Sequence, residues 1–116
     1  MLRILLVEDS ADDAALLRIE LGEAGLHFQL LQVDSERALR DALQAFEPDV
    51  AISDLNLPGY SGLSALALIH QLRPRVPLLL FSGIGYDAHL PVGATVLEKS
   101  ELPRLAAMLS DIAARG

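Results

Sequence analysis

The sequence predicts an α/β protein: a doubly wound, five-stranded parallel sheet with helices on both faces. Short apolar runs alternate along the chain with longer segments whose apolar residues recur at helical spacing, a pattern typical of βαβ units. The apolar runs are continuous, as expected of strands that helices cover on both sides. The chain has 116 residues, about the size of one domain, so we expect a single domain over residues 1–116. The expected strands are 3–7, 28–33, 49–54, 77–81 and 94–97.

The first helix is expected directly after the first strand. Ser10 is a favoured N-cap residue, and Asp12 and Asp13 would place negative charge in the first helical turn. We therefore assign these two carboxylates to the start of the helix rather than to a metal site. Gly25 is expected to end the helix, whose apolar face would consist of Leu17, Leu21 and Ala24.

The second strand carries Gln29 and Gln32 among its apolar residues, which indicates partial exposure at an edge of the sheet. Asp34 or Ser35 would cap the second helix, and Pro48 would end it. Its expected apolar face is Ala38, Leu39, Ala42, Leu43 and Phe46.

The third strand is followed by a loop over 55–61 with two turn signals, Pro58-Gly59 and Gly62. A third helix is then expected to end before Pro74. Its apolar positions are Leu63, Leu66, Ala67 and Ile69. The last helix, 101–114, has the most regular pattern: Leu102, Leu105, Ala106, Leu109, Ile112 and Ala113.

One interval departs from the alternation of strands and helices. Only residues 84–93 separate the fourth strand from the fifth, and they include Gly85, Pro91 and Gly93. A helix there could hardly extend beyond Tyr86 to Leu90, about one turn, and such short helices are marginal. We expect the fourth helix to be shortened or missing.

Composition excludes several classes of protein. The net charge of −7 opposes nucleic-acid phosphates and anionic membranes, and no apolar run approaches the roughly 18 residues of a membrane span. The N-terminus lacks the features of a signal peptide, and the absence of cysteine fits a cytoplasmic protein. Among nine basic residues a single lysine, Lys99, stands against eight arginines.

Polar side chains occur where four of the expected strands end: Glu8 and Asp9, Asp54, Ser82 and Lys99. In open parallel sheets, ligands bind beyond the carboxyl ends of the strands. If the first strand lies beside the third, three carboxylates converge, and such like charges require a cation. Oxygen ligands of this kind suit Mg²⁺, while a lysine could pair with a carboxylate or a phosphoryl oxygen.

Each of these residues also has a plain structural interpretation. Glu8 and Asp9 could favour the start of a helix, and Asp54 could cap a loop or helix. Ser82 could be an ordinary turn residue, and Lys99 a solvated surface charge.

Four motifs, each at an expected strand end, resemble the response-regulator receiver domains of two-component signalling. They are VED at 7–9, SDLNLPGYSG at 53–62, FSG at 81–83 and EKS at 98–100. The resemblance covers essentially the whole chain, which is similar in length to the single-domain chemotaxis response regulator. It implies the flavodoxin-like strand order 2-1-3-4-5.

The resemblance also implies a role for each residue at the metal site. Asp9 would bind Mg²⁺ directly and Glu8 through water, with Asp54 and the backbone carbonyl of Asn56 completing the protein ligands.

A histidine kinase or histidine phosphotransfer protein would supply the phosphoryl group, and Asp54 would accept it. Lys99 would hold that group and Ser82 would donate a hydrogen bond to it. The resulting switch would act on a downstream protein or a fused output domain, and a homodimer is a further option.

The chain departs from the family at three places that concern signal output. Ser100 stands after the lysine where the family usually has proline, Val96 replaces the usual aromatic switch residue, and the fourth helix is curtailed. The residues for phosphorylation are all present, whereas these departures predict an altered output face.

Two rival functions remain. A phosphorylation-independent interaction module could dock partners through Tyr86, Leu90 and Val92. Residues 83–88 match a G-x-G-x-x-A nucleotide or flavin fingerprint, although Pro91 leaves almost no helix to receive a pyrophosphate.

Overall fold

The computed structural model describes residues 1–57, 59–82, 94–98 and 100–115. Its main sheet has five strands in the order β2-β1-β3-β6-β7, and all four strand pairs are parallel. Counted along the chain without the short hairpin β4–β5, this is the predicted order 2-1-3-4-5. The strands are β1 Leu2–Val7, β2 Phe28–Val33, β3 Val50–Asp54, β6 Leu78–Ser82 and β7 Thr95–Glu98.

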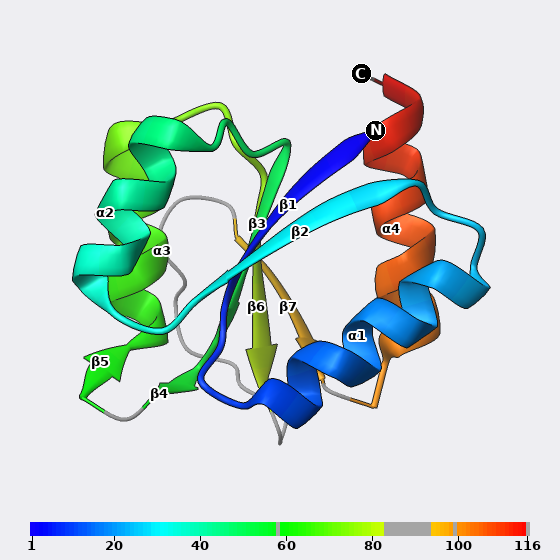
Figure 1. Ribbon diagram of the computed structural model, residues 1–116, viewed down its shortest axis with the longest axis horizontal. Helices are drawn as coiled ribbons and strands as arrows, with labels where there is room; N and C mark the ends of the chain where they lie inside the picture. The colour runs from blue at the N-terminus through cyan, green and yellow to red at the C-terminus, as the bar shows by residue number, and fades with distance from the viewer. Residues whose placement is uncertain (58, 83–93, 99, 116) are drawn as a thin grey trace.

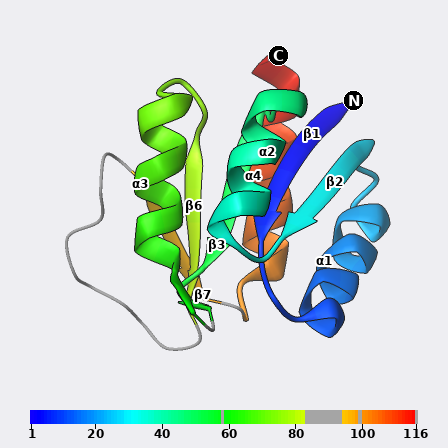
Figure 2. The ribbon, with the colours of Figure 1, turned by 60° about the vertical axis from the view of Figure 1, so that its left-hand side comes forward.

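Helices cover both faces of this sheet (Figures 1 and 2). On one face α1 (Ala11–Glu23) and α4 (Leu102–Arg115) share an apolar core with the sheet, and α2 (Glu36–Ala45) and α3 (Gly62–Leu72) do so on the other. Successive residues of β1 alternate between these cores: Ile4 and Leu6 pack on the α1–α4 side, Leu5 and Val7 on the other. The continuous apolar strands thus reflect burial on both faces.

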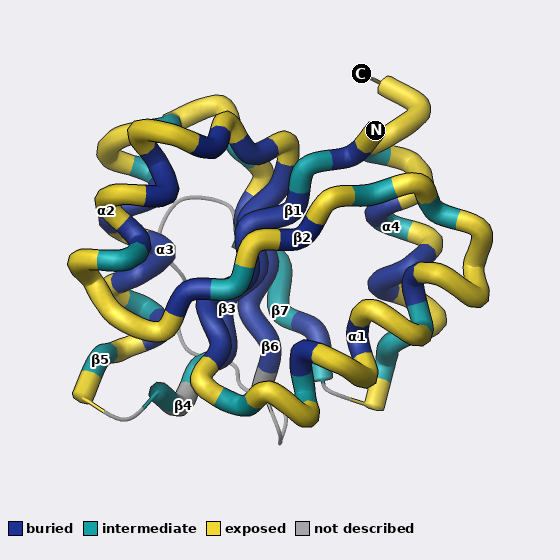
Figure 3. Tube along the Cα trace, viewed as in Figure 1, coloured by how far each residue is buried: buried dark blue, intermediate teal, exposed yellow. Residues whose placement is uncertain are grey.

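Burial falls off from the sheet towards the outer helix faces, as Figure 3 shows. In the edge strand β2, Gln29 is exposed and Gln32 half-buried, as predicted. Three alanines expected on apolar helix faces, Ala24, Ala67 and Ala113, are instead exposed. Ala24 is the C-cap of α1, where the helical periodicity ends.

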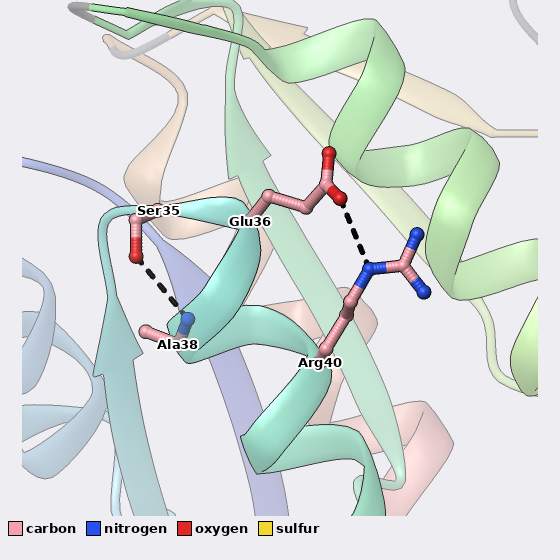
Figure 4. A network of polar contacts seen from close by, with 4 residues as sticks. All are labelled: Ser35, Glu36, Ala38 and Arg40. Carbon is pink, nitrogen blue, oxygen red and sulfur yellow. Dashed lines mark hydrogen bonds and ion pairs between the residues drawn. The ribbon is translucent and has the colours of Figure 1, made fainter.

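Serine is the N-cap residue of α1, α2 and α3. The Ser10 and Ser35 hydroxyls accept hydrogen bonds from the backbone N–H groups of Asp13 and Ala38, at 3.1 and 3.2 Å. Of the two candidates for the second cap, the structure selects Ser35 (Figure 4). The exposed pair Glu36–Arg40 adds one i,i+4 contact to the first turns of α2.

The segment expected to be a simple loop after the third strand contains a small hairpin. Its strands β4 (Asn56–Leu57) and β5 (Tyr60–Ser61) pair antiparallel. Gly59 at the turn has φ +71°, a conformation that favours glycine. The hairpin lies at the same end of the sheet as the arrowheads of β6 and β7 (Figure 1).

The interval expected to hold a shortened or missing fourth helix lies at 84–93, outside the described residues. The part of the chain that the structure describes contains four helices. The proposed docking residues Tyr86, Leu90 and Val92 and the fingerprint at 83–88 also lie outside it.

Candidate functional site

Two central strands bring three carboxylates together. β1 and β3 are neighbours, and their last paired residues are Val7 and Ser53, so Glu8 and Asp54 follow at the same level. One carboxylate oxygen from each of Glu8, Asp9 and Asp54 lies within 4.8 Å of the other two. The convergence expected from adjacent first and third strands is therefore present.

The three carboxylates differ in their access to water. Glu8 and Asp54 are 3% and 5% exposed, whereas Asp9 is exposed. Buried carboxylates at such separations repel one another strongly unless a cation compensates them. The cluster thus consists of two buried carboxylates and one, that of Asp9, which is exposed.

Glu8 is held through its backbone and its side chain. Its N–H donates to the Val33 carbonyl at 2.9 Å, and its own carbonyl accepts from the side-chain amide of Gln32 at 2.8 Å. Its Oε1 accepts from the backbone N–H of Ser10 at 3.1 Å. These contacts tie the strand end to both β2 and the start of α1.

Asp54 is the last residue of β3, and its backbone is enclosed on several sides. It pairs with Phe81 of β6, and the Ser53 hydroxyl donates to the Asp54 carbonyl at 3.1 Å. Gly62, the first residue of α3, packs directly on that carbonyl. A Cβ at position 62 would lie 2.0 Å from the Asp54 oxygen.

In the sequence Gly62 is a turn signal and the last residue of the motif at 53–62. In the structure it is a spacing residue that allows α3 to begin against the backbone of Asp54. Its N–H also donates to the Leu55 carbonyl at 3.3 Å. The available sequence signal was a glycine at a helix start shortly after a strand-end aspartate, where Ser61 supplies the N-cap.

The donor set fits a hard divalent cation. Octahedral Mg²⁺ with bonds of about 2.1 Å holds its oxygens about 3 Å apart when adjacent and about 4 Å apart when opposite. The carboxylate oxygens, all within 4.8 Å, are near that range. Glu8, Asp9 and Asp54 could thus share one such ion, with water filling other positions.

The remaining predicted site residues are only partly described. Asn56 lies in β4 and Ser82 in β6, and the structure describes only the backbone of these two residues. Ser82 ends β6 and pairs with Glu98 of β7. Its backbone therefore lies, like Asp54, at the carboxyl ends of the parallel strands. Lys99 lies outside the described residues. Asp12 and Asp13 occupy the first turn of α1, as predicted.

Two ionisable groups near this edge have shifted pKa values. The pKa of Glu101 is lowered because its carboxylate accepts a hydrogen bond from the Glu98 backbone N–H and a second from Arg104. Burial raises the pKa of the Tyr60 phenol in β5, and the negative charge of Glu36 adds to this effect. Glu101 links the end of β7 to the start of α4.

A search of the described helices for a membrane-crossing segment finds none with sufficient length and hydropathy.

Curated proteins with similar sequences include a methylesterase/glutaminase, a transcriptional regulatory protein and a response regulator. A protein-glutamate methylesterase/protein-glutamine glutaminase of Anaeromyxobacter dehalogenans is 38% identical over 70% of this chain and 23% of its own length. The C4-dicarboxylate transport transcriptional regulatory protein DctD of Pseudomonas aeruginosa is 33% identical over 79% of this chain and 19% of its own. The cell cycle response regulator CtrA of Brucella ovis is 31% identical over 72% and 35%. The chain thus spans between about a fifth and a third of these relatives.

Solved structures share the fold along nearly the whole chain. A response regulator from Hahella chejuensis superposes with a TM-score of 0.79 at 25% identity, covering 97% of this chain and 95% of that one. The response regulator TrrA of Thermotoga maritima, solved in complex with Mg²⁺-BeF, gives a TM-score of 0.81 at 22% identity, with coverage of 97% and 99%.

The family model of the response regulator receiver domain matches residues 4–97. This range includes the carboxylate cluster, the whole of β2, β3 and β6, and most of β1 and β7. Sequence, sheet order and site geometry agree, and the chain belongs to the response regulator receiver domain family.

Proposed function

We propose that this receiver domain accepts a phosphoryl group on Asp54 in a reaction that requires Mg²⁺. The observation that carries the proposal is the meeting of three carboxylates, two of them buried, at the ends of adjacent central strands. An arrangement of like charges in this environment is well suited to a site that is completed by a cation.

In the proposed reaction a carboxylate oxygen of Asp54 attacks the phosphorus of a phosphohistidine on the partner. The new O–P bond forms as the P–N bond breaks, and the electron pair leaves with the imidazole. Phosphoryl transfer asks a protein mainly for positioning and charge neutralisation. A bound Mg²⁺ would neutralise negative charge on the carboxylates and on the phosphoryl oxygens.

The other residues would divide the binding tasks. Asp9 would hold the ion directly, Glu8 would do so through water, and Asn56 would contribute its backbone carbonyl. Lys99 would pair with a phosphoryl oxygen and Ser82 would donate a hydrogen bond to another. The domain would then be a signalling phosphoacceptor that assists its own phosphorylation and dephosphorylation, rather than an enzyme acting on a separate substrate.

The proposed partners are a histidine kinase or histidine phosphotransfer protein upstream, in the cytoplasm, and a protein target or fused output domain downstream. The names of the relatives, a methylesterase and transcriptional regulators, describe different outputs. Phosphorylation would replace the single negative charge of the Asp54 carboxylate by about two on the acyl phosphate, and would add three phosphoryl oxygens that accept hydrogen bonds. This change could bias a two-state element that such a partner reads.

Intact-mass spectrometry after incubation with acetyl phosphate and Mg²⁺ tests the proposal. Wild type should gain a mass of about 80 Da, one phosphoryl group. Asp54→Ala should gain none, and EDTA should abolish the gain in wild type. Asp41→Ala, which changes an exposed carboxylate on α2, is the matched control and should react like wild type.

The same experiment separates the proposal from its main rival. A wild-type protein that gains no mass with any phosphodonor, with or without Mg²⁺, would favour the phosphorylation-independent interaction module. A gain that persists in Asp54→Ala would place the acceptor at another residue.

A further inference from the structure

Gln32 lies where the pairing between β1 and β2 ends. The last paired residues of the two strands are Val7 and Val33, and Gln32 is paired one step earlier with Leu6. One further backbone hydrogen bond follows, from the Glu8 N–H to the Val33 carbonyl at 2.9 Å. The Glu8 carbonyl therefore lies beyond the last paired residues of this ladder.

Beyond the last paired residues, the side chain of Gln32 donates a hydrogen bond to the Glu8 carbonyl. Its Nε2 lies 2.8 Å from the Glu8 carbonyl oxygen, a contact between residues 24 positions apart in sequence. A carbonyl oxygen only accepts hydrogen bonds, so the group facing it must be the NH₂ and the orientation of the amide is determined. Glu8 is 3% exposed, so little water is available to replace this donor.

The carbonyl that Gln32 holds belongs to the peptide between Glu8 and Asp9, two of the three clustered carboxylates. On the other side of that peptide, the Ser10 N–H donates to Glu8 Oε1 at 3.1 Å. The orientation of this peptide is set by ψ of Glu8 and φ of Asp9, and these two angles also set how the two side chains are directed relative to each other. Removing a group that orients metal ligands from outside the ligand shell typically lowers metal affinity by about 10- to 100-fold.

We propose that Gln32 is a positioning residue of the carboxylate cluster: by holding the Glu8 carbonyl it fixes the peptide that carries Glu8 and Asp9 for a divalent cation. This inference rests on the proposed function, because it takes Mg²⁺ as the ion. In this role Gln32 would bind neither the ion nor the phosphoryl group; it would act through the backbone of Glu8, the residue directly after β1.

The test compares Gln32→Met with Gln29→Met. Methionine keeps the length of the side chain and removes the amide donor. Gln29 lies on the same strand but is exposed, so Gln29→Met makes the same chemical change away from the cluster. Titration of each protein with MgCl₂ in a calorimeter should give a Kd about 10-fold higher for Gln32→Met and unchanged for Gln29→Met.

A third variant tests whether lower stability by itself weakens Mg²⁺ binding. Leu30→Ala removes part of a buried side chain of β2 that packs against the α1–α4 core. Titrations are carried out well below all melting temperatures, so Leu30→Ala should melt earlier than wild type and yet bind Mg²⁺ with the wild-type Kd.

A second measurement uses the metal-free protein and so does not depend on the proposed function. Hydrogen exchange of the Ser10 amide, which donates to Glu8 Oε1, should be faster in Gln32→Met than in wild type and unchanged in Gln29→Met. Faster exchange together with the raised Kd is the result expected.

An unchanged Kd for Gln32→Met, with wild type binding Mg²⁺, would overturn the inference and leave the proposed function standing. Equal loss of affinity in Gln32→Met and Leu30→Ala would also overturn it, since both would then report stability. A wild-type protein that binds no Mg²⁺ would overturn the proposed function and with it the role of Gln32 towards the ion.

Discussion

Replacing Gly62 by alanine is expected to separate the start of α3 from the backbone of Asp54. The new Cβ would lie 2.0 Å from the Asp54 carbonyl oxygen and 2.9 Å from its carbonyl carbon, whereas ordinary contact begins at 3.4 Å. The obstacle is backbone rather than a flexible side chain, so the helix or the strand end must move by roughly 1.4 Å.

The magnitude follows from the kind of contact. Overpacking a tightly packed site typically costs 1–3 kcal/mol, and a backbone obstacle favours the upper end, about 3 kcal/mol. For a chain of this size, 1 kcal/mol shifts Tm by about 4 °C, so Gly62→Ala should melt about 12 °C below wild type. Its phosphorylation by acetyl phosphate should also be slower, because the displaced backbone carries the proposed acceptor.

Gly22→Ala is the matched control for this prediction. A Cβ at Gly22 meets no atom within 4 Å, and the residue lies in α1, where alanine is the better helix former by up to about 1 kcal/mol. Thermal unfolding followed by circular dichroism measures both variants. If Gly62→Ala melts at or above the wild-type temperature while Gly22→Ala behaves as expected, the inferred close contact is wrong.

Three further predictions concern the ion, pH and helix capping. Mg²⁺ at about 100 times its Kd should stabilise wild type by about 2.7 kcal/mol in thermal shift measurements, and neither Asp54→Ala nor wild type in EDTA should show this gain. The pKa of Glu101 is lowered in the folded state, so its contribution to stability is present above the unfolded pKa near 4.5 and is lost as pH falls through the lower, folded value. Urea unfolding should therefore find Glu101→Gln less stable than wild type at pH 7, with the difference shrinking below about pH 4.5; a difference that is constant with pH would contradict this assignment. Ser35→Ala removes the N-cap of α2 and should cost about 1 kcal/mol in the same urea assay, whereas no loss would show that the hydroxyl contributes nothing to the helix.

The elements that the sequence predicted correctly are those with a strong local pattern. The second strand was predicted at 28–33 and is β2 at Phe28–Val33, and Ser10 begins α1 as expected. The hairpin β4–β5 was missed because strands of two residues are too short to show any periodicity. The exposed alanines were misjudged because alanine is small enough to be tolerated on either face of a helix.

The candidate site was predicted in part for the same reason. Glu8, Asp9 and Asp54 could be recognised because charged residues at the ends of apolar strands interrupt a local pattern. In the sequence Gln32 indicates only an edge strand, whereas in the structure its amide donates to a carbonyl 24 positions away. Nothing local in the sequence indicates that contact, since it depends on the parallel pairing of β1 with β2.

The sequence by itself determined the strand and helix pattern, the class of fold and the identity of three acidic residues at strand ends. These are properties of neighbouring residues, set by burial on two faces, by helix capping and by charge. Only the tertiary structure decided that Val7 pairs with Ser53, that three carboxylate oxygens lie within 4.8 Å, and that α3 begins against Asp54 because residue 62 is glycine. Strand register and close backbone approach arise between segments far apart in the chain, and the packing of the whole domain fixes them.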